Sequence, residues 1–338
     1  MGLAEDIKAK ALALGFDVAG ITDAAPIDNR QFKLLADWVA FGYAGRMNYM
    51  RENLDKRANP AKLLKSARSV ICVGLNYTPL SDRGTRDERR RTRDETGHLP
   101  SSSPMGRVAN YAQYEDYHSF IKRQLRNLVD FISSVADGEH EFKICVDSVP
   151  LAERALAVRA GLGFIGKSHI LIHPMLGPQI FLGEIITSLK LQADEPIADS
   201  CHSCNKCIEA CPTGALRADG QFDANKCISY LTIEYSQGGR LSAKGQIPAG
   251  LAEKVGDRLF GCDECVLACP YQKEAPVCKN RQFKFYSDRA KLDLGRVLDL
   301  TEEDFYAEFG DSPIKRSGLS LLKRNARICL SNITRHSI

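Results

Sequence analysis

The spacing of eight cysteines constrains this chain more than any other feature of its sequence. One run has the pattern C-x2-C-x2-C-x3-C-P, a second run has the pattern C-x2-C-x3-C-P, and a single cysteine stands between them. Two-residue spacers let successive thiolates reach corners of one [4Fe–4S] cube, and the cysteine before the proline ligates the other cube of a pair. The pattern therefore predicts two four-iron clusters and one-electron transfer.

The same rule divides the cysteines into two ligand sets. The first cluster takes Cys201, Cys204, Cys207 and Cys269. The second cluster takes Cys211, Cys227, Cys262 and Cys265. Because C-x2-C pairs also bind zinc tetrahedrally, a zinc-binding protein is the alternative that the pattern leaves open.

The rest of the composition is that of an ordinary globular protein of 338 residues, long enough for one large or two medium domains. The first residues, Met1–Asp6, contain acids and no signal-type apolar stretch, and no run approaches the ~20 apolar residues of a membrane span. Twelve cysteines without an export signal favour a reducing compartment. We therefore expect a cytoplasmic protein outside the membrane and, since nothing suggests an obligate interface, a monomer.

The charged residues are unevenly distributed, although the net charge of +4 alone is too small to predict nucleic-acid binding. The segment from Ser312 to Ile338 contains no acid. Its cations are Lys315, Arg316, Lys323, Arg324, Arg327 and Arg335. A basic surface of this kind suits a phosphate backbone, and an ordinary solvated chain end is an equal alternative.

Residue patterns divide the chain into three regions. Residues 1–190 are expected to form a mixed α/β domain, in which the polar, charge-balanced stretch 81–104 is a mobile insert. Helices are predicted at Leu3–Leu14, Asp116–Val135 and Leu151–Ala160, and strands at Phe16–Thr22, Ser69–Tyr77, Phe142–Asp147 and Ile180–Leu189. Residues 191–282 are expected to form the two-cluster domain, and residues 283–338 a small helical, basic cap with a helix at Leu319–Leu330.

The segment Gly161–Ser168 matches two phosphate-loop patterns, G-x-G-x-x-G and G-x-x-x-x-G-K-[ST]. Both patterns need a strand before the loop and a helix after it, because the helix N-terminus faces the phosphates. Here the predicted helix comes first, and the β-branched segment His169–Pro174 follows. This order argues against nucleotide binding, although a glycine loop can still approach another flat or anionic ligand.

The segment Asp116–His118 opens like a D-x-H-x-x-G motif whose histidine ligates cobalt. The glycine of that motif is missing, since Ile121 stands in its place, and the segment begins a predicted helix. We therefore interpret His118 as a structural or pocket-lining residue.

Taken together, these features resemble the epoxyqueuosine reductases, a family of cobalamin-dependent iron–sulfur enzymes of queuosine tRNA modification. The resemblance covers nearly the whole chain apart from the insert. Its most specific blocks are Val146–Arg154 and Gly161–Lys167, because many ferredoxin-like modules share the cysteine pattern alone. The other blocks are Gly15–Thr22, Trp38–Met50, Arg57–Pro60, Gly106–Ala112, Asp116–His118, Cys227–Glu234, Phe260–Cys265 and Leu321–Ala326.

The resemblance implies an α+β protein. It would comprise a nitroreductase-like, cobalamin-binding α/β domain, a bacterial two-[4Fe–4S] ferredoxin-like domain and a small helical C-terminal cap. It also implies that epoxyqueuosine in a tRNA anticodon stem-loop is reduced to queuosine. The epoxide oxygen would leave as water, with electrons from an external donor.

Several site residues follow from the resemblance. Asp147 matches the family's proton donor, and the residues expected to approach the corrin are Arg57, Asn110, Asp147, Lys167 and Ser168. Two departures stand out: Ser168 replaces a common asparagine, and Gln113–Glu115 replaces a more glycine-rich stretch of the pocket wall.

On spacing alone, Asp147 is most simply a cap or turn residue, because it follows an apolar strand and precedes a helix start. As a proton donor it must stay protonated near neutral pH. We therefore expect burial beside the corrin to raise its pKa. Cobalamin would gather the electrons that iron–sulfur clusters deliver one at a time.

Two other functions fit parts of the sequence. A ferredoxin-type electron carrier would bind no corrinoid and would leave residues 1–190 without a purpose. A corrinoid reductase of the dehalogenase type would share both kinds of cofactor but act on a small molecule. It would have no use for the acid-free C-terminal segment.

Overall fold

The computed structural model describes residues 2–79, 103–235 and 246–335. The expected insert at 81–104 therefore lies almost entirely outside the described residues. The mixture of helices with antiparallel and mixed sheets confirms the expected α+β class.

A four-stranded antiparallel sheet forms the centre of the first half of the chain, with the strand order β1-β2-β7-β4. Its strands are β1 (Val18–Asp23), β2 (Ser69–Asn76), β4 (Phe142–Cys145) and β7 (Ile180–Thr187). All residues of β2 are buried, as expected for an apolar, β-branched run covered on both faces. The four predicted strands are confirmed, each shifted or shortened by a few residues.

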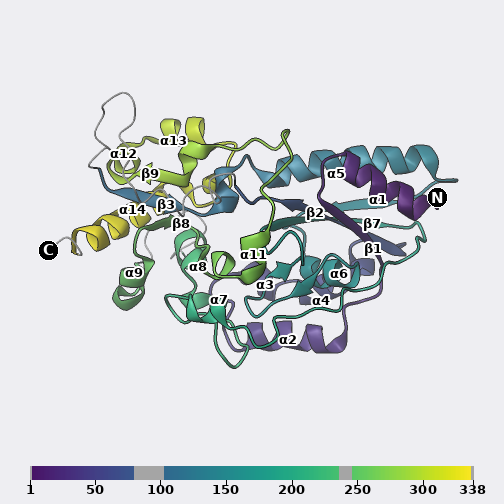
Figure 1. The fold of residues 1–338 in the computed structure, drawn as a ribbon, viewed down its shortest axis with the longest axis horizontal. Helices are drawn as coiled ribbons and strands as arrows, with labels where there is room; N and C mark the ends of the chain where they lie inside the picture. The colour runs from purple at the N-terminus through teal and green to yellow at the C-terminus, as the bar shows by residue number, and fades with distance from the viewer. Residues whose placement is uncertain (1, 80–102, 236–245, 336–338) are drawn as a thin grey trace.

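Helices cover both faces of this sheet (Figure 1). Helices α1 (Leu3–Ala13) and α5 (Tyr117–Val135) pack on one face, and α6 (Glu153–Arg159) packs on the other. The buried residues of α5 recur at helical spacing, which explains why one side of this helix faces the sheet. Two core clusters result, one beneath α1 and α5 and one beneath α6.

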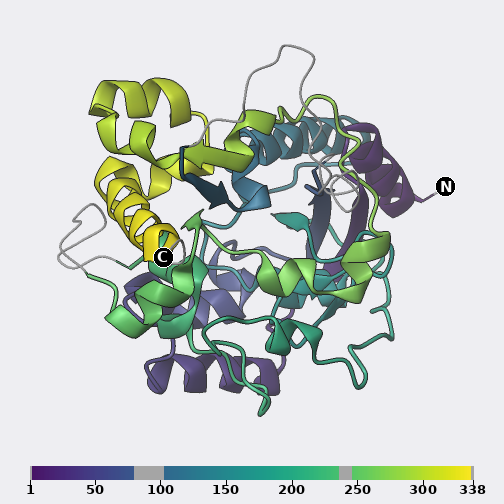
Figure 2. The same ribbon diagram turned by 60° about the vertical axis from the view of Figure 1, so that its left-hand side comes forward.

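A second, three-stranded sheet joins segments from all three predicted regions. Strand β3 (Met105–Val108) pairs in parallel with β8 (Arg258–Phe260) and antiparallel with β9 (Lys291–Asp293). The C-terminal helix α14 (Gly318–Arg335) contacts β8 and α12, and Figure 2 shows it in yellow beside that part of the chain. The expected regions thus share one core rather than meeting only at linkers.

Short elements complete the fold. The helices are α2 (Asn29–Ala40), α3 (Asn48–Arg51), α4 (Leu54–Ala58), α7 (Lys206–Glu209), α8 (Ile228–Ile233), α9 (Ala249–Val255), α10 (Glu264–Leu267), α11 (Pro270–Glu274), α12 (Leu294–Asp299) and α13 (Glu302–Phe309). The strands β5 (Phe164–Ile165) and β6 (Leu171–Ile172) form a small hairpin. Within the described part of the chain, every helix is too short or too polar to cross a bilayer.

Candidate active site and iron–sulfur centres

The first predicted set of cysteines surrounds one cavity of about 590 Å³. Burial raises the pKa of the Cys207 thiol, and Cys201 and Cys269 raise it further because like charges repel. Burial also raises the pKa of Cys269, and Cys201 and Cys204 add to that effect. The structure therefore brings these four thiols together, although three of them precede the other set in the sequence and Cys269 follows it.

The second predicted set also gathers in one place. Cys227 directly precedes α8, and Cys265 lies in α10. Burial raises the pKa of Cys265 well above its ordinary value, and Cys227, Cys262 and Cys211 each contribute to the same direction. Across residues 2–79, 103–235 and 246–335, no three His, Cys, Asp or Glu side chains are arranged around a position for a metal ion.

The glycine loop borders the first cysteine set. It follows α6 and leads into β5, so the helix-before-strand order predicted against a nucleotide site is confirmed. The Lys167 backbone N–H donates to Cys201 Sγ at 3.4 Å, and Lys167 Nζ donates to Asn205 Oδ1 at 2.9 Å and to a backbone carbonyl beside it. A Cβ on Gly166 would stand 3.2 Å from Cys201 Sγ. Glycine is therefore needed here for close approach to a cysteine.

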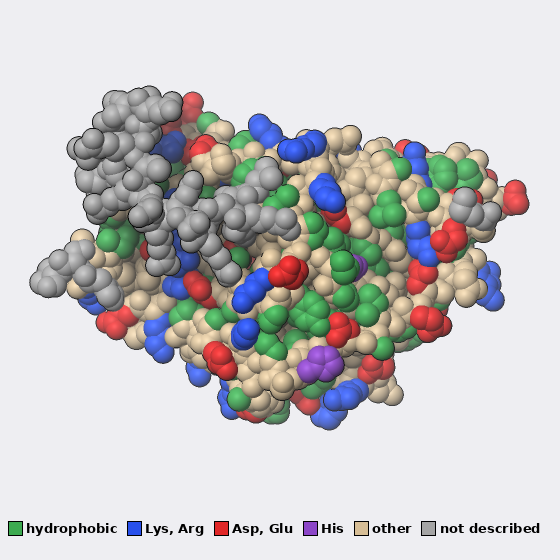
Figure 3. All heavy atoms as spheres, viewed as in Figure 1, with side chains coloured by type: hydrophobic (Ala, Val, Ile, Leu, Met, Phe, Trp, Pro, Cys, Tyr) green, Lys and Arg blue, Asp and Glu red, His purple; other side chains and the backbone are tan. Residues whose placement is uncertain are grey.

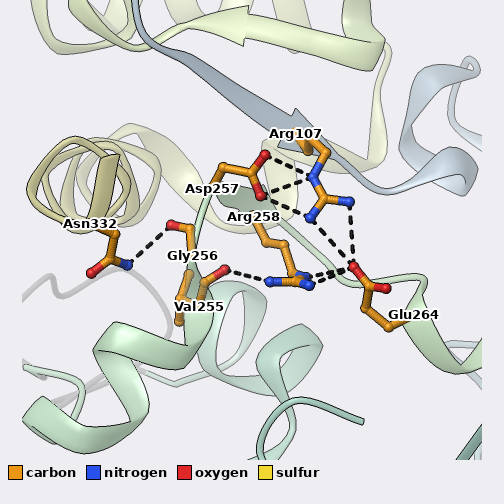
Figure 4. A network of polar contacts seen from close by, with 7 residues as sticks. All are labelled: Arg107, Val255, Gly256, Asp257, Arg258, Glu264 and Asn332. Atoms are coloured by element: carbon orange, nitrogen blue, oxygen red, sulfur yellow. Dashed lines mark hydrogen bonds and ion pairs between the residues drawn. The ribbon is translucent and has the colours of Figure 1, made fainter. Parts of the chain in front are cut away.

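A network of ion pairs holds the segment between Cys262 and Cys265 (Figure 4). Arg107 Nε on β3 donates to both carboxylate oxygens of Asp257 at 2.9 Å. Arg258 Nη2 donates to Glu264 Oε1 at 2.5 Å, and the Arg107 guanidinium reaches the same oxygen at 3.4 Å. Since Glu264 lies next to Cys265, its contact with Arg107 on β3 links the second cysteine set to the first half of the chain.

Asp147 lies in the loop between β4 and α6, where three side chains converge on its carboxylate. Tyr117 Oη donates to Asp147 Oδ2 at 3.0 Å, and His118 Nε2 lies 3.1 Å from the same oxygen. Arg316 Nη1 approaches it at 3.5 Å from the C-terminal region. The Asp147 side chain is still 44% exposed, so its carboxylate is accessible to a ligand.

The surroundings of Asp147 overturn the expectation that its carboxyl is neutral. Burial favours the protonated form, but His118, Arg316 and Tyr117 outweigh it and lower the pKa of Asp147. Burial opposes the charge of His118, yet hydrogen bonds with Asp116 and Asp147 raise its pKa from 6.5 to about 9. At neutral pH the proton therefore resides on His118, whose Nδ1 lies 2.8 Å from Asp116 Oδ1.

The cluster of Asp116, Tyr117 and His118 around Asp147 was missed by reasoning from the sequence. His118 was interpreted as structural or pocket-lining, and nothing in the sequence placed it beside a residue about thirty positions later. The sequence signal that could have indicated this cluster was the run of three polar or aromatic side chains, Asp116–His118, at the start of a helix. Asp116 caps α5 by accepting from the His118 N–H, which fixes the direction of the first turn.

Arg57 and Asn110, two of the expected corrin contacts, have different surroundings. Arg57 Nη2 donates to the Tyr49 backbone carbonyl at 3.1 Å, and its buried Nε has no partner among the described residues. Asn110 is buried, and its backbone N–H donates to Asp263 Oδ2 at 2.6 Å, beside the second cysteine set. Ser168 lines the cavity of the first cysteine set.

Most cations of the acid-free C-terminal segment contact groups within the protein. Lys315 pairs with Asp116, Arg335 pairs with Glu253, and Arg316 pairs with Glu234 as well as Asp147. Arg324 is buried and donates to the backbone carbonyls of Tyr235 and Leu231. The face in Figure 3 likewise shows basic and acidic side chains interspersed. The segment is therefore chiefly structural, and only Lys323 and Arg327 are left as candidates for a phosphate contact.

Comparison with known proteins identifies the family. Over 98% of its length, the chain is 34% identical to the epoxyqueuosine reductase of Vibrio cholerae, of which it covers 83%. The chain belongs to the epoxyqueuosine reductase family. The family model "Epoxyqueuosine reductase QueG, DUF1730" matches residues 57–148, which include the Asp147 loop. The "4Fe-4S double cluster binding domain" matches residues 200–272, so this family member carries an iron–sulfur domain with two clusters.

Solved epoxyqueuosine reductases share the fold over almost the whole chain. One crystal structure, obtained with an epoxyqueuosine-modified tRNA-Tyr stem loop, is 31% identical, with a TM-score of 0.85 over 99% of this chain and 82% of its own. The Bacillus subtilis reductase is 30% identical, with a TM-score of 0.84 over 99% of this chain and 82% of its own. These relationships favour the reductase over the electron carrier and the small-molecule reductase.

Proposed function

We propose that this protein reduces epoxyqueuosine in the anticodon of tRNA to queuosine. The reaction takes up two electrons and two protons and releases the epoxide oxygen as water. The similarity along nearly the whole chain to epoxyqueuosine reductases carries this proposal, together with the solved relative that holds a modified tRNA stem loop. The acidic and basic groups around the accessible Asp147 carboxylate are the protein's own means of supplying protons.

We assign the cluster ligands as the sequence spacing predicts. Cluster one takes Cys201, Cys204, Cys207 and Cys269, and cluster two takes Cys211, Cys227, Cys262 and Cys265. The first set lines one cavity and the thiols within each set raise one another's pKa, which supports the assignment. The backbone N–H of Lys167 is aimed at Cys201, as expected for a donor that stabilises a cluster thiolate.

We propose cobalamin as the second cofactor, held by Arg57, Asn110, Asp147, Lys167 and Ser168. The residues fit such a ligand, because the buried Arg57 Nε has no partner among the described residues and the Asp147 carboxylate is accessible. When bound, cobalamin supplies a low-valent cobalt centre that accumulates electrons delivered singly by the clusters. Lys167 already contacts the cysteine segment, so it would link the cofactor site to cluster one.

His118 and Asp147 together supply the proton in this proposal. His118 holds the proton at neutral pH, and its Nε2 shares it with Asp147 Oδ2. The exposed carboxylate can relay that proton to the leaving oxygen, and His118 is then reprotonated from solvent. Tyr117 orients the carboxylate through its hydroxyl, and Asp116 stabilises the charged imidazole.

The Asp147 loop is also the part of the site expected to move. The Bacillus subtilis relative is described with its aspartate catalytic loop swung out of the active site. We propose that residues 146–152 form the corresponding loop here. A positive φ of 50° at Asp147 supports this view, because a non-glycine residue in that conformation needs its neighbours to hold it.

We further propose that the protein works as a cytoplasmic monomer fed by an external electron donor. A reducing compartment would keep the cluster thiolates available and supply the electrons. We propose that Lys323 and Arg327 contact the phosphate backbone of the tRNA.

Anaerobic reconstitution tests the function directly. The purified protein is loaded with iron, sulfide and cobalamin, desalted, and given a chemical reductant with an epoxyqueuosine-modified anticodon stem-loop. We expect corrinoid absorbance, the paramagnetic resonance signals of two reduced four-iron clusters, and formation of queuosine. A protein without corrinoid absorbance would be an electron carrier. Corrinoid binding without turnover of the stem-loop would favour a small-molecule reductase. Zinc as the only metal bound by the thiolates would exclude both the electron carrier and the reductases.

A further inference from the structure

A carboxyl group lies in the middle of the central sheet without an obvious purpose. Glu184 occupies β7 between Cys72 on β2 and Cys145 on β4, and its side chain is completely buried. Neither carboxylate oxygen has a hydrogen-bond donor among the described residues. An acid isolated in this way is costly in an apolar core, so it must keep a proton or share one.

The partner for that proton is Glu153, at the start of α6. The two carboxyl groups interact across the sheet–helix interface, and two carboxylates in contact cannot both stay ionised. Burial raises the pKa of Glu184 well above its ordinary value. Burial and the nearby Asp147 charge raise the pKa of Glu153 to about 7. At neutral pH, protonated Glu184 therefore donates to a Glu153 that is partly ionised.

Glu153 in turn holds the backbone of Asp147. The Asp147 N–H donates to Glu153 Oε1 at 2.5 Å, and a hydrogen bond of this kind is stronger when the accepting carboxylate is ionised. Asp147 has a φ of 50°, which L residues rarely adopt without support. The bond to Glu153 holds the backbone at Asp147 itself, and the Ala152 N–H donates to the Arg57 carbonyl at the end of the loop, whereas Tyr117 and His118 hold only the Asp147 side chain.

We infer that Glu184 and Glu153 form a proton-sharing latch that keeps the Asp147 loop in the active site, with Glu153 as a positioning residue. When Glu153 is ionised, it accepts a strong hydrogen bond from the Asp147 N–H. Uptake of a second proton by the pair weakens this hydrogen bond and lets the loop leave the active site. The inference rests on the proposed role of Asp147. It assigns control of the active-site loop to Glu153 and Glu184, which touch neither substrate nor cofactor.

The charged and titratable groups facing Glu153 set the pH at which the latch changes. Burial and the Asp147 charge disfavour the ionised form of Glu153, whereas its hydrogen bonds with the Asp147 backbone and with Glu184, and the charge of Arg154, favour it. Other titratable groups within electrostatic reach are Arg57 on α4, Tyr117 on α5, Cys72 on β2 and Cys145 on β4. The two cysteines and Tyr117 have raised pKa values and stay neutral near pH 7. The Glu153–Glu184 pair is therefore the part of this group that titrates there.

Hydrogen exchange of the loop tests the latch without relying on turnover. The holoprotein is labelled between about pH 5.5 and pH 8, and the exchange of peptide 146–152 is corrected for the intrinsic pH effect. In the wild type we expect protection to rise with pH around a midpoint near pH 7, by about tenfold, which corresponds to one hydrogen bond of ordinary strength. Glu153→Gln should abolish the pH dependence, and the exposed matched control Glu139→Gln should keep it.

Glu184→Gln provides the second variant. Its amide donates to Glu153 as protonated Glu184 does, so the midpoint should stay near the wild-type value, whereas Glu184→Met removes the donor and should move the midpoint to higher pH. Turnover should follow the same midpoints through kcat, with KM unchanged. An unchanged midpoint in a folded Glu184→Met, or wild-type exchange in a folded Glu153→Gln, would overturn the latch. A catalytically neutral Asp147→Asn would instead refute the proposed role of Asp147 and leave the exchange result standing.

Discussion

Asp116 sets the protonation of His118, so its charge should control the alkaline limit of the reaction. Asp116 and Asp147 together raise the pKa of His118 from 6.5 to about 9, and the hydrogen bond with Asp116 is the largest single favourable effect. That increase corresponds to about 3.4 kcal/mol at about 1.36 kcal/mol per pH unit. Divided equally between the two acids, it gives about 1.7 kcal/mol for Asp116, and Asp116→Asn should lower the pKa of His118 by about one unit. Asparagine keeps the helix cap, so the fold should not change.

The assay is single-turnover reduction of the modified stem-loop between pH 6 and pH 10. Because protonated His118 is the active form, the wild-type rate should fall as pH rises through about 9. In Asp116→Asn the same fall should occur about one unit lower. Lys315→Gln is the matched control, since it removes the other partner of Asp116 and leaves the His118 hydrogen bond in place. The reasoning would be refuted if the alkaline limb stayed at the wild-type pH in Asp116→Asn, or persisted unchanged in His118→Gln.

Three further changes probe the rest of the site. Asp147→Asn should keep both clusters and stem-loop binding but lower the single-turnover rate by about 10²–10⁴-fold, and wild-type turnover would remove Asp147 from the proton path. Cys211→Ser should lower bound iron from about eight to about four per chain while cluster one persists, and a loss confined to the signals of cluster one would contradict the ligand sets. Gly166→Ala should destabilise cluster one, because its Cβ meets Ile172 and approaches Cys201 Sγ at 3.2 Å. If cluster one in Gly166→Ala survives in air as long as in the wild type, the loop accommodates the added methyl group.

Local patterns in the sequence were sufficient to predict the main elements. The apolar run at Ser69–Tyr77 became the fully buried β2, and the periodic segment Asp116–Val135 became α5, because each pattern matches one backbone geometry. The cysteine spacing likewise anticipated which thiols gather, since spacers of two and three residues limit how far each thiolate can reach. The order of helix and strand around Gly161 was also readable, because it depends only on neighbouring residues.

The electrostatics of the site could not be read from the sequence. Asp147 was expected to be neutral, and only the fold shows that His118 and Arg316, which lie far away along the chain, hold it ionised. The cations after Ser312 looked available to a phosphate backbone until packing placed Lys315 and Arg316 against acids. The sequence by itself determined the main helices and strands and the family resemblance, and it predicted the two cysteine sets. The tertiary structure decided which groups carry charge, because a pKa depends on neighbours and burial that the chain acquires only when distant segments pack together.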